Sequence, residues 1–279
     1  ISINDVSLKE GNSGTTNFSF TITRTGDTTG NSSIKFATSD GTAKNTDYTS
    51  KSGVVNFAAG ETAKTQVYTI TVGSPPSTLS AVKDSYLRNL LPNINEGDNK
   101  ALFVTYLGTD RTLLAFDQAQ ITAAAAGKTL QSATLKVYIN SNLNDWGTGR
   151  TIEARTLTAT WVEGNGYNEN IIVPIKGTGH GVTWSCADDT NINNNNKDCT
   201  TSWNGGKFGA VSSTVNITNG KSGWISFDVK GNVQAFLGAP STNYGWMIKK
   251  SDESKSGLIT FASSESSANT PQLVLTFAP

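Results

Sequence analysis

The residues Gly73-Ser74-Pro75-Pro76-Ser77 end one regular strand pattern and precede another. Two adjacent prolines lack backbone N–H donors and hold the chain near polyproline II, so no central strand can cross them. We therefore predict a first domain at residues 1–72, a short linker at 73–79 and a second domain at 80–279. A chain of 279 residues is long enough for two domains with cores of their own.

The charged residues are few and balanced, with 22 Lys and Arg against 22 Asp and Glu, or 16% of the chain. Such a surface lacks the basic face that binds nucleic acid and the polybasic segment that binds anionic membranes. No apolar run approaches the ~20 residues of a membrane span. The surface is rich in Thr, Ser, Asn and Gly, and the start at Ile1 indicates a processed mature form. We expect a secreted or cell-surface protein.

Cys186 and Cys199 are the only cysteines, and they flank a polar loop rich in Asn and Asp. We predict a disulfide between them, because closing a loop of this length stabilises a fold by ~3 kcal/mol in the chain-entropy model. Two thiols and the distant His180 would make a poor zinc site. A disulfide indicates an oxidising compartment.

Alternating apolar and polar residues predict that the first domain is all-β. Phe18, Phe20 and Ile22, for example, share one face of a strand. The predicted strands are residues 1–8, 17–23, 34–38, 53–57 and 66–72. Residues 1–72 are few for a complete two-sheet sandwich, which usually needs ~100 residues.

Several stretches of this domain resemble a Calx-β domain. They are Phe36-Ala-Thr-Ser-Asp-Gly-Thr-Ala43, Asp47-Tyr48, Phe57-Ala-Ala-Gly-Glu-Thr62 and an opening strand that leads into Glu10-Gly11. The resemblance implies an immunoglobulin-like sandwich in which an acidic cluster and two more strands come next. Here the proline-rich linker stands in their place, so the resemblance implies an incomplete sandwich.

The same resemblance suggests a calcium site. By position, Glu10, Asp40 and Asp47 match acidic residues that bind calcium in some members of the family. Calcium takes six to eight oxygen ligands, and the absent acidic cluster would supply most of them. The alternative is that Asp40 and Asp47 are turn residues that bond to nearby backbone amides. We otherwise expect no cofactor.

Two absent strands would leave unpaired backbone groups and an apolar groove in the first domain. The second domain could fill the gap, or another copy of the protein could insert a strand, as in donor-strand complementation. The segment 1–8 suits such a donor strand because it alternates and has no proline. Its apolar residues are Ile1, Ile3, Val6 and Leu8. The alternative is that this segment is the ordinary first strand of its own domain.

Strand patterns continue through the second domain. Residues 134–139 and 152–157 alternate cleanly, as do several later segments. The exception is residues 231–237, which have helical spacing and which Asp228 would cap. We predict a larger, jelly-roll-like sandwich with one short helix.

This domain resembles the DNRLRE family of secreted bacterial and archaeal proteins. The matching stretches, in order, include Asp84-Ser-Tyr-Leu-Arg88, Arg111-Thr-Leu-Leu-Ala-Phe-Asp117, Trp161-Val-Glu-Gly164, Asn243-Tyr-Gly-Trp246 and Pro271-Gln-Leu-Val-Leu275. The resemblance implies a non-catalytic sandwich, and some members are related to carbohydrate-binding modules. It names no ligand.

The chain offers little for catalysis. His180 is the only histidine, no Gly-x-Ser-x-Gly motif occurs, and Glu153, Glu163 and Glu169 form no recognisable catalytic pair. We predict that the protein is not an enzyme.

Aromatic residues in polar loops offer a sugar site instead, because carbohydrate rings stack on exposed aromatic faces. The candidates are Trp146, Tyr167, Trp184 and Trp203. The alternative is that these rings belong to the edge of the core.

Two functions follow. The first is a secreted structural protein that assembles by strand exchange into an extracellular filament or matrix fibre, with other copies of itself as partners. The second is a carbohydrate-binding or adhesion module whose partner is a polysaccharide.

Overall fold

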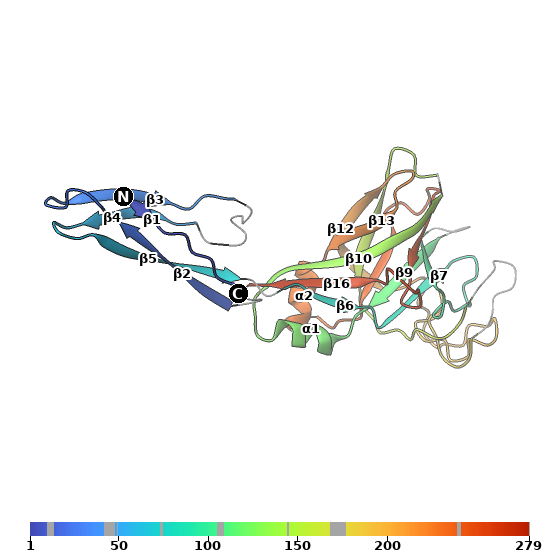
Figure 1. Ribbon diagram of the computed structural model, residues 1–279. Coiled ribbons are helices and arrows are strands. Elements are labelled where there is room, and N and C mark those ends of the chain that lie inside the picture. The colour runs from blue at the N-terminus through green and yellow to red at the C-terminus, as the bar shows by residue number, and fades with distance from the viewer. Residues whose placement is uncertain are drawn as a thin grey trace. The chain divides into compact units, whose positions relative to one another are not determined.

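The structure is a computed structural model that describes residues 1–9, 14–41, 48, 50–72, 75–104, 109–143, 145–167, 177–238 and 241–278. It contains two compact units, Ile1–Pro76 with Phe277–Pro279, and Ser77–Thr276. We call them the N-terminal unit and the C-terminal unit. Both consist mainly of antiparallel strands, which confirms the predicted all-β class (Figure 1).

The described residues of the N-terminal unit form two small sheets. Their strands are β1 (Ser2–Ile3), β2 (Gly14–Thr23), β3 (Ser32–Ala37), β4 (Ser52–Phe57) and β5 (Ala63–Val72). One sheet has the order β1-β2-β5, and the other pairs β3 with β4. β2 and β5 are the longest strands of this unit and lie side by side, from Gly14 opposite Val72 to Thr23 opposite Ala63.

The alternation predicted from the sequence gives this unit its core. Ile22, Val55 and Phe57 are its buried apolar residues among those described, and Ile34 and Phe36 pack against them. The polar residues between them on β3 and β4 are exposed. A core of this size is small for a two-sheet sandwich, which fits a domain that lacks strands.

The first strand is shorter than the sequence predicts. β1 covers Ser2–Ile3 and pairs with β2 in the same unit. At Asn4 the side chain Oδ1 accepts the backbone N–H of Thr21 at 2.6 Å. This bond takes the place of a ladder bond, because Asn side chains compete locally with strand pairing. The predicted strand over residues 1–8 was therefore too long.

The C-terminal unit has two larger sheets. Its strands are β6 (Ser77–Ser80), β7 (Lys83–Arg88), β8 (Ala101–Val104), β9 (Asp110–Ala115), β10 (Leu130–Leu143), β11 (Arg150–Leu157), β12 (Phe208–Ile217), β13 (Gly223–Asp228), β14 (Trp246–Lys250), β15 (Leu258–Ala262) and β16 (Gln272–Phe277). The β10 sheet has the order β6-β16-β10-β15-β8, and β13 also pairs with β10. The β11 sheet has the order β12-β11-β14-β9-β7. β6 and β16 are antiparallel partners, with Ser77 opposite Leu275.

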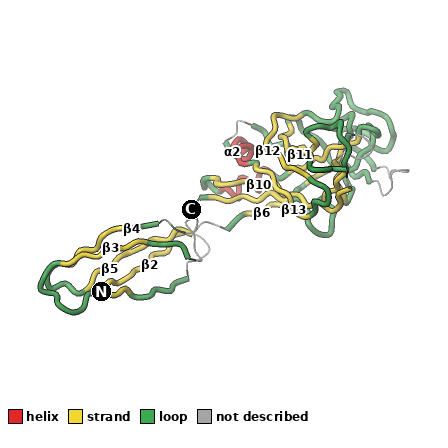
Figure 2. The backbone as a smooth tube through the Cα atoms, turned by 90° about the horizontal axis from the view of Figure 1, so that it is seen from above, coloured by secondary structure: helices red, strands yellow, loops and turns green. Residues whose placement is uncertain are grey.

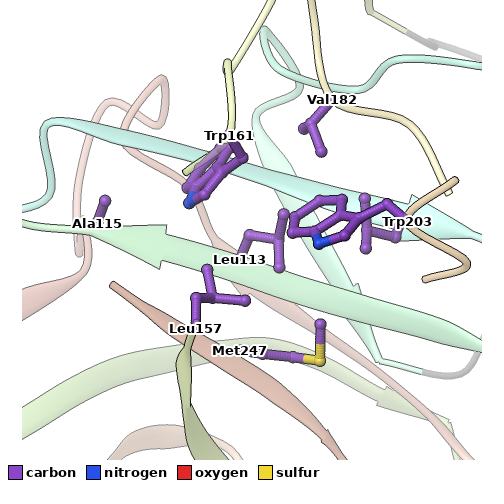
Figure 3. Close-up of a cluster of buried hydrophobic side chains, with 8 residues drawn as sticks. Leu113, Ala115, Leu157, Trp161, Val182, Trp203 and Met247 are labelled. Carbon is purple, nitrogen blue, oxygen red and sulfur yellow. The ribbon is translucent and has the colours of Figure 1, made fainter. Parts of the chain in front are cut away.

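Loops cover one face of the β11 sheet. Figure 3 shows Trp161, Trp203 and Val182 on loop segments beside side chains of the strands below. The buried cluster contains Leu87, Leu113, Ala115, Leu157, Trp161, Val182, Trp203 and Met247. Every residue of β14, at the centre of this sheet, is buried. A strand buried on both faces does not alternate, which is why a sequence pattern alone cannot show this loop layer.

Two short helices, drawn in red in Figure 2, belong to the C-terminal unit. The predicted helix is confirmed as α2 (Lys230–Leu237), although Val229 holds the cap position and Asp228 Oδ1 accepts the N–H of Lys230 at 2.9 Å. The prediction of one helix was wrong, because α1 (Gln118–Ala125) is a second. Neither helix, nor any other among the described residues, is long and apolar enough to cross a membrane.

The missed helix has a physical basis in its sequence. Asp117 Oδ1 accepts the backbone N–H of Ala119 at 2.7 Å and so caps the first turn. An alanine run follows, and alanine is the strongest helix former. The helix ends at Ala126 and Gly127, both with positive φ.

The predicted disulfide between Cys186 and Cys199 is confirmed, with 5.9 Å between the two Cα atoms. It closes part of the loop layer, in which Asp189 is fully buried. The two carboxylate oxygens of Asp189 accept the backbone N–H groups of Asn191 and Asp198. The polar loop is thus ordered by one covalent bond and by side chains that bond to its own backbone.

Candidate functional site

The aromatic residues predicted for sugar binding do not form a surface. Trp146 and Trp203 are 1% and 3% exposed, so neither ring offers a face to a sugar. Both belong to the packed interior. Trp203 packs against the β11 sheet, and the Trp146 indole N–H donates to the carbonyl of Leu258 at the start of β15. Tyr167 and Trp184 are half-buried. For Trp146 and Trp203 the expected surface role was wrong.

Trp184 is already engaged within the protein. The guanidinium of Arg111 lies 4.7 Å from the centre of its ring. Glycine is required at Gly205, where a Cβ would lie 2.6 Å from the same ring. Arg111 also forms a bidentate ion pair with Glu253, with bonds of 2.7 and 2.9 Å. These contacts tie the Trp184 ring to the loop layer.

A different aromatic pair lies on the outer face of the β10 sheet. Tyr138 on β10 and Trp224 on β13 are directly opposite in the register, and their ring centres are 5.4 Å apart in an edge-to-face arrangement. The Lys136 ammonium lies 4.9 Å from the centre of the Trp224 ring. We call these three residues the Tyr138–Trp224 face.

Strand alternation explains why this face points outward. On β10 the intervening residues Val137 and Ile139 are buried, and on β13 Ile225 and Phe227 are buried. Successive strand residues point to opposite sides of a sheet, so Lys136, Tyr138 and Trp224 lie on the other side, where they are half-buried. The same side carries Thr134 opposite Asp228 and Lys136 opposite Ser226. The arrangement joins two aromatic rings to a row of polar and charged groups.

The acidic and basic residues near β11 neutralise one another. Glu153 Oε1 accepts hydrogen bonds from Arg155 at 2.6 Å and Lys249 at 3.2 Å. Burial favours the neutral acid, but these two partners outweigh it and keep the pKa of Glu153 below its ordinary value. His180 Nδ1 pairs with Asp188 at 2.9 Å on an exposed loop. Both Glu153 and His180 therefore have structural partners of their own.

The N-terminal unit contains an open apolar groove of about 700 Å³. Its aromatic walls are Phe18, Phe20, Phe36 and Tyr68, all of them half-buried. Tyr68 meets Phe20 and Phe36 edge-to-face, at 5.3 and 5.8 Å between ring centres. Ile3 and Val6 from the first segment line the same groove. The predicted apolar groove is present, and part of the segment 1–8 already lies along it.

The other predicted residues of that unit are only partly described. Ile1, Ile3 and Leu8 of the segment 1–8 are 55%, 57% and 52% exposed. Among the predicted calcium ligands, Asp40 is exposed and its Oδ1 accepts the Tyr48 hydroxyl at 2.9 Å. Glu10 and Asp47 lie outside the described residues. The calcium site of the N-terminal unit stays a prediction.

Three carboxylates in the C-terminal unit come together from distant parts of the sequence. One oxygen each of Asp84, Glu163 and Glu265 lies within 4.8 Å of the others. Asp84 is on β7, Glu163 follows Trp161 in a turn of the loop layer, and Glu265 lies between β15 and β16. Spacing in the sequence gives no sign of this cluster, because only the fold brings the three together.

Two family models match parts of the chain. Residues 4–73 match the Calx-beta domain, which confirms the resemblance of the first domain. Residues 178–277 match carbohydrate-binding module family 96, while the resemblance to the DNRLRE family stays a prediction. No curated protein matches the chain. The chain is thus similar to a Calx-beta domain in its N-terminal unit and to a carbohydrate-binding module over the later strands of its C-terminal unit.

Proposed function

We propose that the C-terminal unit binds a polysaccharide through the Tyr138–Trp224 face. The observation that carries the proposal is an outward aromatic pair on strands whose other faces are buried. Partly exposed aromatic rings can stack on the apolar faces of sugar rings, and nearby polar groups can form hydrogen bonds with the sugar hydroxyls. The match to a carbohydrate-binding module includes Trp224, although Tyr138 and Lys136 lie before it.

Lys136 favours a polysaccharide that carries carboxylate or sulfate groups. Its ammonium lies beside the Trp224 ring, where a bound acidic sugar would replace a weak cation–π contact of about 0.5–1 kcal/mol with an ion pair. The disulfide fits an oxidising compartment, which supports a site of action outside the cell. The function that we propose is therefore that of a non-catalytic, extracellular polysaccharide-binding module.

Removing the aromatic pair should remove binding without unfolding the unit. We expect Trp224→Ala and Tyr138→Ala each to weaken binding to soluble acidic polysaccharides at least about tenfold, which corresponds to about 1.4 kcal/mol. Affinity gel electrophoresis and isothermal titration calorimetry would measure this loss. Val211→Ala is the matched control, because Val211 is an apolar residue, 43% exposed, on β12 of the other sheet.

A second pair of variants tests the charge. Lys136→Ala should weaken binding to acidic polysaccharides more than to neutral ones, whereas Lys221→Ala, at an exposed lysine off the face, should change neither. Unchanged binding in all the Tyr138, Trp224 and Lys136 variants would place the ligand elsewhere. No binding by the unaltered protein to any polymer of a broad panel would reject the function itself.

The groove of the N-terminal unit supports a second candidate function, assembly by strand exchange between copies. The groove is apolar, and β5 has β2 as its strand partner on one side but no paired strand on the other among the described residues. Only Ile3 and Val6 of the segment 1–8 line the groove, and Ile1, Ile3 and Leu8 all remain exposed. A strand from a second copy would cover more of the groove and pair with a free edge.

Deleting residues 1–8 tests this candidate. If the segment is the donor strand, the unaltered protein forms regular fibres in negative-stain electron microscopy, and the deletion abolishes them. Polysaccharide binding by the C-terminal unit should survive the deletion, so the two functions are separable. Monomers at high concentration in both samples, seen by light scattering, would contradict strand exchange and show that the segment stays in its own groove.

A further inference from the structure

We propose that Asp84, Glu163 and Glu265 bind a calcium ion that joins three segments of the C-terminal unit. Two oxygens that share a calcium ion at about 2.3–2.6 Å lie no more than about 5 Å apart. The three carboxylate oxygens lie within 4.8 Å of one another and so meet this limit. Carboxylates are hard oxygen ligands, which calcium prefers.

The second observation is an oxygen that has no partner. Asp84 is fully buried, and its Oδ1 has no hydrogen-bond partner among the residues that the structure describes. Its other oxygen, Oδ2, accepts the backbone N–H of Ser264 at 2.7 Å. Glu265 repeats the pattern, because its Oε1 accepts the Ser264 hydroxyl at 2.8 Å while its buried Oε2 has no partner in the described part of the chain. A buried oxygen without a partner is costly, and a cation bound to these carboxylates would supply one.

No side-chain cation lies within ion-pair distance of this cluster among the described residues, although Lys83 attracts Glu163 at longer range. None of the ion pairs within 4.0 Å involves Asp84, Glu163 or Glu265. The nearest basic neighbour in sequence, Lys83, donates to the Trp161 carbonyl at 2.6 Å and lies 4.2 Å from the centre of the Trp161 ring. Its ammonium is therefore held by the loop layer and forms no ion pair with Glu163 within 4.0 Å.

The segments around the cluster are held in place without the ion. Asn95 is buried, and its Nδ2 donates to the carbonyls of Glu163 at 2.6 Å and Val182 at 2.7 Å. Its Oδ1 accepts the N–H groups of Gly97 and Gly166. Only glycine fits at Gly97, because a Cβ there would collide with the Glu163 carbonyl oxygen. This support orders the Glu163 turn, as a binding site requires.

The test uses the full chain stripped of metal by a chelator. Terbium serves as a luminescent substitute for calcium, excited through tryptophan. All six tryptophans lie between residues 146 and 246, in the C-terminal unit, so the signal reports on a site in that unit. We expect terbium luminescence that calcium displaces with one site per chain, a melting temperature that rises with calcium, and weaker competition by magnesium.

Substitutions locate the site. Glu265→Gln, at a half-buried position, should lower the calcium affinity at least about tenfold and remove the calcium-dependent rise in melting temperature. Asp84→Asn should do the same where it folds, and Asp40→Asn in the N-terminal unit is the control that should change neither. Unaltered terbium binding in Glu265→Gln, or no response of the unaltered protein to terbium and calcium, would overturn the proposal. Competition by magnesium as strong as by calcium would overturn the choice of cation.

Discussion

Trp203→Ala is expected to lower the free energy of unfolding of the C-terminal unit by about 3–5 kcal/mol, the usual loss when a large buried aromatic is removed. Trp203 is 3% exposed and packs in the cluster between the loop layer and the β11 sheet (Figure 3). The substitution leaves a cavity under the loops, beside Trp161 and Val182. Urea unfolding followed by tryptophan fluorescence would measure the loss, since this signal comes from the C-terminal unit alone.

The matched comparison is Trp224→Ala, the same substitution on the Tyr138–Trp224 face. A half-buried cross-strand pair contributes about 0.2–1 kcal/mol, so we expect a loss of about 1 kcal/mol or less. We therefore expect the two substitutions to have different effects: Trp203→Ala should lower stability, and Trp224→Ala should weaken binding. The opposite result, a stable Trp203→Ala protein that no longer binds polysaccharide, would make Trp203 the ligand platform and contradict its burial.

Arg88→Met should destabilise the C-terminal unit by a similar amount, about 3–5 kcal/mol at neutral pH, because it leaves a buried carboxylate without its cation. Arg88 Nη1 and Glu96 Oε1 are 2.7 Å apart, and their side chains are 6% and 0% exposed. The other partners of Glu96, the Asn99 amide at 3.1 Å and the Tyr86 hydroxyl, are neutral. Urea unfolding at neutral pH would measure the effect.

The pH dependence of this loss has a definite sign. Burial raises the pKa of Glu96 in the folded protein, and Arg88 opposes that rise, so removing Arg88 raises the pKa further. Folding then favours the protonated acid. The loss of stability in Arg88→Met should be small below the ordinary Glu pKa of about 4.3. It should grow as the pH rises toward the pKa of Glu96 in the folded variant. The double variant Arg88→Met with Glu96→Gln should recover most of the lost stability. A loss under about 1 kcal/mol in Arg88→Met alone would contradict the prediction and indicate that water solvates the ion pair.

The sequence reveals the strands of this protein more readily than its surfaces. Strands with one buried face alternate, so residues 17–23 and 134–139 were predicted close to β2 and the centre of β10. The α1 segment was missed, although Asp117 and the alanine run that follows it are helix signals in themselves. Alternation also places Tyr138 on the side opposite Val137. It does not reveal that Trp224 is the partner, because register between distant strands is a tertiary property.

The failure at Trp146 and Trp203 has a related cause. A tryptophan in a polar loop is exposed only if the loop stays off the sheet, and here the loop layer folds onto it. The three acidic residues of the proposed calcium site lie on a strand, in a loop turn and between two later strands. No local pattern links them, whereas the two cysteines could be paired because the chain holds no others.

The pairing of β6 with β16 determines how the C-terminal unit would respond to tension. Ser77 begins β6, and it lies opposite Leu275 near the end of β16, so the chain enters and leaves the unit at the same end of two neighbouring strands. A force applied between these two points would act on the hydrogen bonds of the β6–β16 pair one after another, starting from that end, and not on all of them together. A module tethered at both points would therefore begin to open at this pair.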